Sequence, residues 1–142
     1  MAATVDYDDV EVGAEIGPRE FSITRLDLVK YCGASGDFNV IHWNQRIARS
    51  VGLPDVIAHG MFTMAQAARL VTDWCGDPGA LVEYRVRFSR PVVVPDDEAG
   101  ATLTVQARVE SKLDDRRVSL FVEASTPDGS VLTGARALVQ LA

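Results

Sequence analysis

The second half of the chain alternates between apolar and polar side chains. From residue 81 to residue 142, apolar residues recur at about every second position, which is the pattern of strands that bury one face. Turn-forming residues at 95–98, 114–115 and 127–129 divide this region, so we predict a succession of antiparallel strands. The apolar positions are Val82, Tyr84, Val86 and Phe88; Leu103, Val105, Ala107 and Val109; Val118, Leu120, Val122 and Ala124; and a last strand from Val131 to Leu141.

Residues 1–80 lack this alternation and predict loops and helices. Thr24 and Asp27 have the spacing of a helix start, in which each side chain bonds the backbone of the other. We therefore expect a short helix from Arg25 to Cys32, with Gly33 as its stop.

A longer helix is predicted for residues 61–74, which carry almost no charge before Arg69. A helix that is apolar nearly all round is a buried helix. One buried helix and four or five strands with one apolar face each pack economically when the sheet curls around the helix. The pattern thus predicts a single α+β domain over residues 1–142, with the hot-dog arrangement of a curved antiparallel sheet around a long buried central helix.

Composition and charge narrow the functions to consider. The 142 residues are 47% hydrophobic and 24% charged, as in ordinary globular proteins. The net charge of −6 disfavours nucleic acid as a partner, because phosphate contacts need a basic surface. The two cysteines form no disulfide framework, and the sequence has neither a signal peptide nor an apolar run of membrane-spanning length. We therefore expect a cytoplasmic protein without a membrane partner.

Residues with catalytic chemistry gather in the segment 35–42, which contains Asp37 and His42. A carboxylate and an imidazole in an irregular, glycine-bearing loop can converge and serve as an acid and a base, or hold one water between them. The alternative is purely structural: Asp37 caps the turn, and His42 is a buried histidine with satisfied nitrogens. No glycine-rich phosphate loop and no zinc-binding motif occurs, so we expect neither a cofactor nor a metal.

The order of residues in this segment resembles a known motif. Ser35-Gly-Asp-Phe-Asn-Val-Ile-His42 is similar to the Gly-Asp-x-Asn-Pro-aliphatic-His pattern of the MaoC-like dehydratase family, which includes the (R)-specific enoyl-CoA hydratases. Residues 57–61 look like the start of that family's central helix, and the resemblance covers nearly the whole chain. Three stretches, at 42–43, 58–64 and 76–80, look most like the catalytic B-type subunits of mycobacterial (3R)-hydroxyacyl carrier-protein dehydratases.

The resemblance implies a hot-dog lyase that interconverts (3R)-3-hydroxyacyl thioesters and trans-2-enoyl thioesters. For the proton transfers of this reaction we expect His42 to act as the base and Asp37 as the proton donor; the reverse split, or one water shared by both, stays open. The backbone N–H near Gly60 would bind the thioester oxygen at the positive end of the central helix. Asn39 would hold the loop in place through side-chain hydrogen bonds.

The sequence departs from the family pattern at two positions, and it offers three weaker candidates for functional residues. Val40 stands where the family usually has proline, and Ala68 stands about where some hydratases carry a serine, which puts the serine-assisted detail in doubt. Arg85 and Arg87 form a basic strand face that suits the phosphates of CoA or an acidic carrier protein, although such a face is more commonly just solvated. For His59 we expect a structural role.

The predicted ligand is an acyl-CoA or acyl-carrier-protein thioester. The predicted assembly is a homodimer or a heterodimer with a related hot-dog subunit, because pairing of two subunits would cover their edge strands. Two other functions remain open. One is a non-catalytic partner subunit that only binds acyl thioesters, and the other is a hot-dog thioesterase. The presence of both Asp37 and His42 disfavours each of them.

Overall fold

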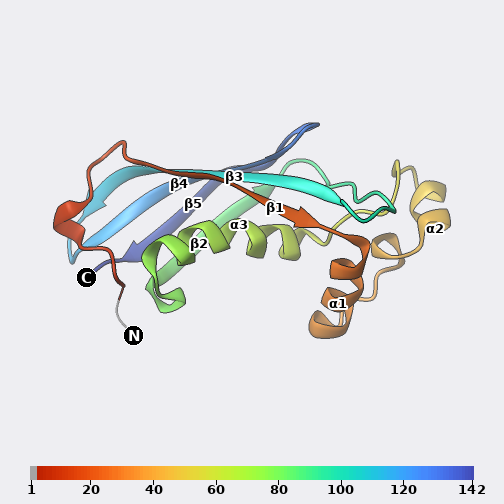
Figure 1. Ribbon diagram of the computed structural model, residues 1–142, viewed down its shortest axis with the longest axis horizontal. Helices are drawn as coiled ribbons and strands as arrows, with labels where there is room; N and C mark the ends of the chain where they lie inside the picture. Colours follow the sequence, from red (N-terminus) through yellow and green to blue (C-terminus); the bar gives the residue numbers. More distant parts are fainter. Residues whose placement is uncertain (1–2) are drawn as a thin grey trace.

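A computed structural model of the chain describes residues 3–142. Its main element is one five-stranded antiparallel sheet with the strand order β1-β3-β4-β5-β2 (Figure 1). Single 3₁₀ turns lie before the first strand, at Tyr7–Asp9, and between longer elements, at Val40–His42 and Pro78–Ala80. Those elements are β1 (Glu15–Ile23), α1 (Arg25–Ser35), α2 (Gln45–Ser50), α3 (Gly60–Cys75), β2 (Leu81–Phe88), β3 (Ala101–Leu113), β4 (Arg117–Thr126) and β5 (Gly129–Gln140).

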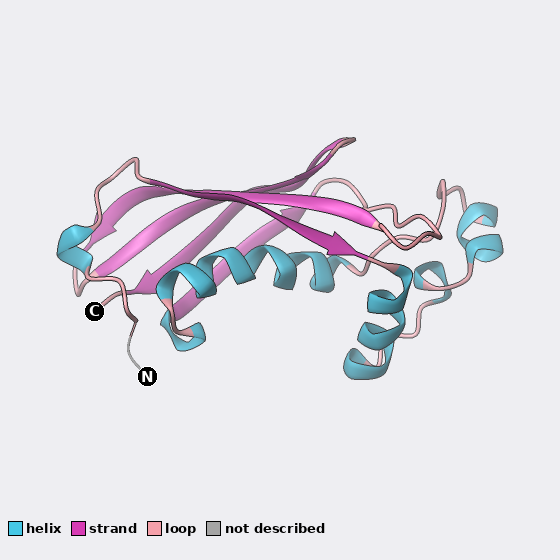
Figure 2. Cartoon of the chain, in the orientation of Figure 1, coloured by secondary structure: helices cyan, strands magenta, loops and turns pink. Residues whose placement is uncertain are grey.

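The sheet curves over α3, which runs along its concave side (Figures 1 and 2). The alternation of the sequence explains this packing, because β3 and β4 bury every second side chain through most of their length. Side chains such as Leu103 and Leu120 are fully buried, and burial of a leucine stabilises a fold by about 1.5–3 kcal/mol. The α+β hot-dog architecture predicted from the sequence is confirmed.

The helix α3 differs from its prediction in one respect. Its inner face is buried through Thr63, Ala67, Leu70, Val71 and Cys75, but its outer face is not. One sheet covers only one side of a helix, so Met61 on the outer side remains 59% exposed in the single chain. Within residues 3–142, no helix is long and apolar enough to cross a membrane.

The predicted end of the first helix is wrong by three residues. The helix α1 begins where expected, with a complete capping box between Thr24 and Asp27, but it continues through Gly33 to Ser35. A glycine inside a helix costs only about 1 kcal/mol relative to alanine, so Gly33 does not force a stop. The helix ends at Gly36, whose left-handed backbone (φ 75°) allows its N–H to bond the carbonyl of Cys32.

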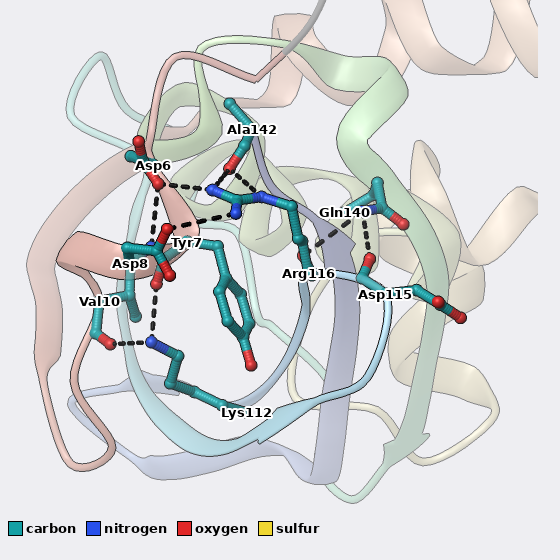
Figure 3. A network of polar contacts seen from close by, with 9 residues as sticks. All are labelled: Asp6, Tyr7, Asp8, Val10, Lys112, Asp115, Arg116, Gln140 and Ala142. Carbon is teal, nitrogen blue, oxygen red and sulfur yellow. Dashed lines mark hydrogen bonds and ion pairs between the residues drawn. The ribbon is translucent and has the colours of Figure 1, made fainter.

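A polar network joins the segment before β1 to the end of the chain (Figure 3). Arg116 donates to a carboxylate oxygen of Asp6 at 2.6 Å and to the carbonyl of Ala142 at 2.7 Å. Lys112 donates to the carbonyl of Tyr7 at 2.7 Å and lies over the Tyr7 ring. These groups lie at the end of the fold away from α1 and α2, so they stabilise the sheet without contributing to the segment 35–42.

We predict that Gly100 tolerates no side chain. Gly100 has a positive φ of 67°, and a Cβ there would overlap the carbonyl group of Ile23 in β1. Gly134 is a matched control, because its φ is 57° and a Cβ would meet nothing within 4 Å. The left-handed conformation alone costs an L-residue about 1–2 kcal/mol, so Gly134→Ala should lose that amount of unfolding free energy and Gly100→Ala clearly more. Urea unfolding of the two variants measures the difference, and equal losses would contradict the predicted overlap.

Candidate functional site

The loop after α1 is held in shape by its own side chains. The hydroxyl of Ser35 accepts a hydrogen bond from the N–H of Asp37 at 3.1 Å. The Asp37 carboxylate accepts from the N–H of Asn39 at 3.1 Å, and the Asn39 side chain accepts from the N–H of Ile41 at 3.3 Å. Three successive turns of this kind need short polar side chains at alternate positions, which is what residues 35–39 supply. Asp37 is therefore a turn residue and is also exposed to solvent.

A short segment before α3 anchors this loop to the rest of the fold. The N–H of Ile57 donates to the carbonyl of Ile41 at 3.3 Å, and the N–H of Ala58 donates to the carbonyl of Val92 at 2.8 Å. Ile57 also forms an isolated antiparallel bridge with Val93. The loop is thus connected through residues 56–58 to the backbone that follows β2.

His42 is buried with one nitrogen already bonded. Its side chain is at the end of the 3₁₀ turn, the residue is 8% exposed, and Nδ1 lies 2.7 Å from the carbonyl oxygen of Ile57. Because a carbonyl only accepts, Nδ1 carries the proton in the neutral ring and Nε2 keeps its lone pair. Burial lowers the pKa of His42 below its ordinary value of 6.5, which favours this neutral form at neutral pH.

His59 lies directly beside His42, at the N-terminal cap of α3. The two imidazoles stack with ring centroids 3.8 Å apart and an angle of 22° between their planes. His59 is 2% exposed, and its Nε2 is 3.1 Å from the backbone carbonyl of Asp37. The expectation of a structural histidine therefore missed that this ring touches both candidate residues. Its position directly before Gly60 was the signal that could have placed it in the site.

These three residues form a compact group of polar atoms. A carboxylate oxygen of Asp37 and one ring nitrogen from each of His42 and His59 lie within 4.8 Å of one another. Such donors occur in zinc sites, where nitrogen lies about 2.0–2.1 Å from the metal. Imidazoles stacked face to face direct their in-plane lone pairs alongside each other and not toward one point, so this geometry suits proton transfer better than metal binding.

The pockets around this group meet at the start of α3. One, of about 370 Å³, contains His42, and the other, of about 470 Å³, contains Asp37. Gly60 and Phe88 line both, and no side chain in the described part of the chain caps the first turn of α3. A reacting group that contacts both Asp37 and His42 therefore lies beside Gly60 and the Phe88 ring. The sequence pattern gave Phe88 only as an apolar strand position and carried no sign of this location.

Arg85 and Arg87 lie apart from this group. Both are exposed on β2, and Arg85 forms an ion pair with Glu83 of the same strand. Neither lines the two pockets beside Asp37 and His42. The basic residue that does line the His42 pocket is Arg90, just beyond the end of β2.

The fold and the loop sequence have known relatives. Residues 9–125 match the MaoC-like domain family, and the chain belongs to this family. It is 30% identical over 138 residues to the 3-hydroxybutyryl-CoA dehydratase of Methylorubrum extorquens, which covers 95% of this chain and 83% of that protein. A solved structure of a MaoC-like dehydratase superposes with a TM-score of 0.95 at 38% identity, covering 99% of this chain and 43% of that one.

A further relative is considerably longer. The 3-hydroxyacyl-thioester dehydratase X of Mycobacterium tuberculosis is 45% identical over 73 residues, which are 51% of this chain. The matched part is 25% of that protein's length. The chain thus corresponds to one part of a larger polypeptide in this relative.

We predict that His42 titrates below 6.5 and is protonated at Nδ1 when neutral. Burial removes solvent from the imidazolium form, and the Ile57 carbonyl selects the tautomer. Because the unfolded chain holds this proton more tightly, this group's contribution to the free energy of unfolding falls as the pH drops below 6.5 through the titration of folded His42. Long-range ¹H–¹⁵N NMR of the two histidines reports both properties. A ring protonated at Nε2, or a pKa at or above that of the urea-unfolded chain, would contradict the structure.

Proposed function

We propose that the chain reversibly dehydrates (3R)-3-hydroxyacyl thioesters to trans-2-enoyl thioesters, carried on CoA or on an acyl carrier protein. The observation that carries the proposal is the convergence of the Asp37 carboxylate and a ring nitrogen of His42, whose Nε2 is unprotonated, beside the uncapped N-terminus of α3. The names of the relatives in Methylorubrum and Mycobacterium support it, because both describe dehydratases of 3-hydroxyacyl thioesters. We further propose the cytoplasm as the compartment, which suits two buried free cysteines.

Dehydration moves two protons. A base removes one from C2, and an acid gives one to the C3 hydroxyl, which leaves as water when the C3–O bond breaks. We assign the first step to Nε2 of His42, which has a free lone pair in a neutral, buried ring. We assign the second to Asp37, whose carboxylate lies within 4.8 Å of a ring nitrogen of His42. Asp37 lines the second pocket together with Gly60 and Phe88. No electrons are transferred, so these steps need no redox cofactor.

Removal of the C2 proton places negative charge on the thioester oxygen. The first N–H groups of a helix have no partner inside the helix, and they lie at the positive end of its dipole. Gly60 is the first residue of α3 and lines both pockets, so its N–H is the donor that we assign to this oxygen. Asn39 supports the assignment indirectly, because it orders the loop between Asp37 and His42.

We also propose that the protein works as a dimer, either with itself or with a related hot-dog subunit. The strand order leaves β1 and β2 as edges, with backbone groups free to pair. Val82 and Phe88 on β2 and Met61 on α3 are exposed apolar side chains near the β2 edge of the sheet and the start of α3. Pairing through β2 would cover these side chains and the edge together.

Substitutions of Asp37 and His42 test the proposed chemistry. Asp37→Asn keeps an oxygen for the N–H of Asn39, and His42→Asn keeps a donor for the Ile57 carbonyl, so both variants should fold. A positioned acid or base contributes about 10²–10⁴-fold, and each change should lower kcat for hydration of crotonyl-CoA by that order. Because both groups act in one step, the double variant should be scarcely slower than the slower single one. Asp96→Asn, in an exposed turn, is the control.

The same assay separates the proposed lyase from the two other functions. Loss of enoyl absorbance without release of thiol is the expected result for a hydratase. Release of free thiol would identify a thioesterase, and an unchanged substrate would favour a non-catalytic partner subunit. Full activity in either single variant, at an unchanged melting temperature, would return Asp37 and His42 to purely structural roles.

We predict that Gly60→Val lowers turnover more than stability. A Cβ at Gly60 would lie 3.2 Å from the Phe88 ring, in the space that both pockets share. Valine keeps the N–H, but its side chain would crowd the place of the thioester oxygen and keep it from this donor. Loss of one donor to the developing oxyanion typically lowers kcat by about 10²–10³-fold. Gly33→Val is the matched control, since Gly33 is also helical and a Cβ there would meet nothing within 4 Å. A folded Gly60→Val enzyme with normal kcat would overturn the assignment of this N–H.

We predict a dimer by analytical ultracentrifugation, with about twice the monomer mass of 15.4 kDa. Val82→Lys should weaken it, because a lysine on an apolar edge opposes strand pairing. Val12→Lys is the control, since Val12 is similarly exposed but lies outside β2. A stable and active monomer at micromolar concentration, without any partner subunit, would refute the dimer.

A further inference from the structure

We propose that His59 is a positioning residue that holds the two catalytic groups of the proposed dehydratase in their relative geometry. The inference rests on the proposed function. It concerns His59, which lines the Asp37 pocket but has no part in either of the proton transfers that we assign, and it is carried by the contacts of His59 with His42 and with the backbone of Asp37.

The first contact orients the base. The His59 ring covers one face of His42, at 3.8 Å between centroids. The Nδ1 hydrogen bond to Ile57 fixes one edge of the His42 ring, but a single hydrogen bond leaves the ring free to tilt about it. The stacked neighbour removes this freedom, so the direction of the Nε2 lone pair is set by Ile57 and His59 together.

The second contact fixes the acid. Nε2 of His59 donates to the backbone carbonyl of Asp37 at 3.1 Å. The hydrogen bonds within the loop hold its shape, but they do not tie the Asp37 backbone to the rest of the fold. The His59 bond supplies that connection, and it starts from the residue that precedes Gly60. One imidazole therefore links the base, the acid and the proposed oxyanion donor.

The unpaired nitrogen of His59 argues against a purely stabilising role. With Nε2 as the donor, Nδ1 is a buried acceptor, and it has no hydrogen-bond partner among residues 3–142. An unsatisfied buried polar group costs about 1–3 kcal/mol. A phenylalanine would fill the same space against Tyr31 and His42 without this cost. Stability alone therefore favours an apolar ring here, whereas the bond to the Asp37 carbonyl needs the imidazole.

Two variants separate the effect of the stack on His42 from the effect of the hydrogen bond to Asp37. His59→Phe keeps the stack on His42 and removes the bond to Asp37, while His59→Gln keeps a donor near the Nε2 position and removes the stack. Each should lower kcat for crotonyl-CoA hydration at least about tenfold, with a smaller change in KM, because misplacement affects the reacting geometry more than binding. His59→Phe should melt close to the wild type, because it removes the bond to the Asp37 carbonyl and the unpaired Nδ1 together.

Double variants show through which catalytic group each His59 variant lowers kcat. His59→Phe should add little to the loss caused by Asp37→Asn, because both act through the same group. Likewise, His59→Gln should add little in the His42→Asn background. Wild-type kcat in both single variants, or losses that multiply in both double variants, would overturn the positioning role. A loss of kcat that only follows a lower melting temperature would overturn it too.

An NMR measurement tests the inference even if the wild type proves inactive toward acyl thioesters. In His59→Phe and His59→Gln the only remaining histidine is His42, so its ring signals are unambiguous. The groups that face this ring are His59, Asp37 and the Ile57 carbonyl. Loss of the stack in His59→Gln should broaden the His42 ring resonances, whereas the stack retained in His59→Phe should preserve their line width. A His42 line width in His59→Gln that equals that of the wild type would contradict the inference, whatever the activity.

Discussion

The packing of α3 against the concave face of the sheet determines where chemistry can occur in this protein. Small and apolar side chains, Ala67 and Val71 among them, bury the inner face of α3 and fix its axis along the sheet. The N-terminus of the helix is then held beside the backbone that follows β2, because Ala58 bonds to the carbonyl of Val92. A helix N-terminus is a fixed source of positive potential, so the fold itself supplies the place where an oxyanion is stabilised.

The loop that carries Asp37 and His42 is built differently, from local hydrogen bonds and two histidine contacts. Its own side chains hold its shape, while Ile57 and His59 tie it to the start of α3. Burial of His42 next to this helix end has a chemical consequence. Removal of solvent lowers the pKa of His42 and keeps the ring neutral, which is the form that accepts a proton. The contacts that tie the loop to the start of α3 therefore also keep His42 in its proton-accepting form.

Sequence patterns predicted the parts of this structure that depend on local periodicity. The alternation after residue 81 gave the strands, because one buried face imposes a period of two. The end of α1 was missed because Gly33 and Gly36 are both possible stops, and only the chain path after the helix requires the left-handed residue at Gly36. The contacts of His59 and the position of Phe88 depend on segments far apart in sequence, which no periodicity reports. The family motif led to Asp37 and His42, but it carried no information about which neighbours hold them.

The most direct measurement is a crystal structure of the Asp37→Asn variant with (3R)-3-hydroxybutyryl-CoA. This variant removes the proposed proton donor and should leave the loop intact, so the substrate should remain unreacted in the site. We expect the thioester oxygen about 2.7–3.1 Å from the Gly60 nitrogen, C2 facing Nε2 of His42, and the hydroxyl within hydrogen-bond distance of the side chain at position 37. An acyl group bound away from both His42 and Gly60 would contradict it.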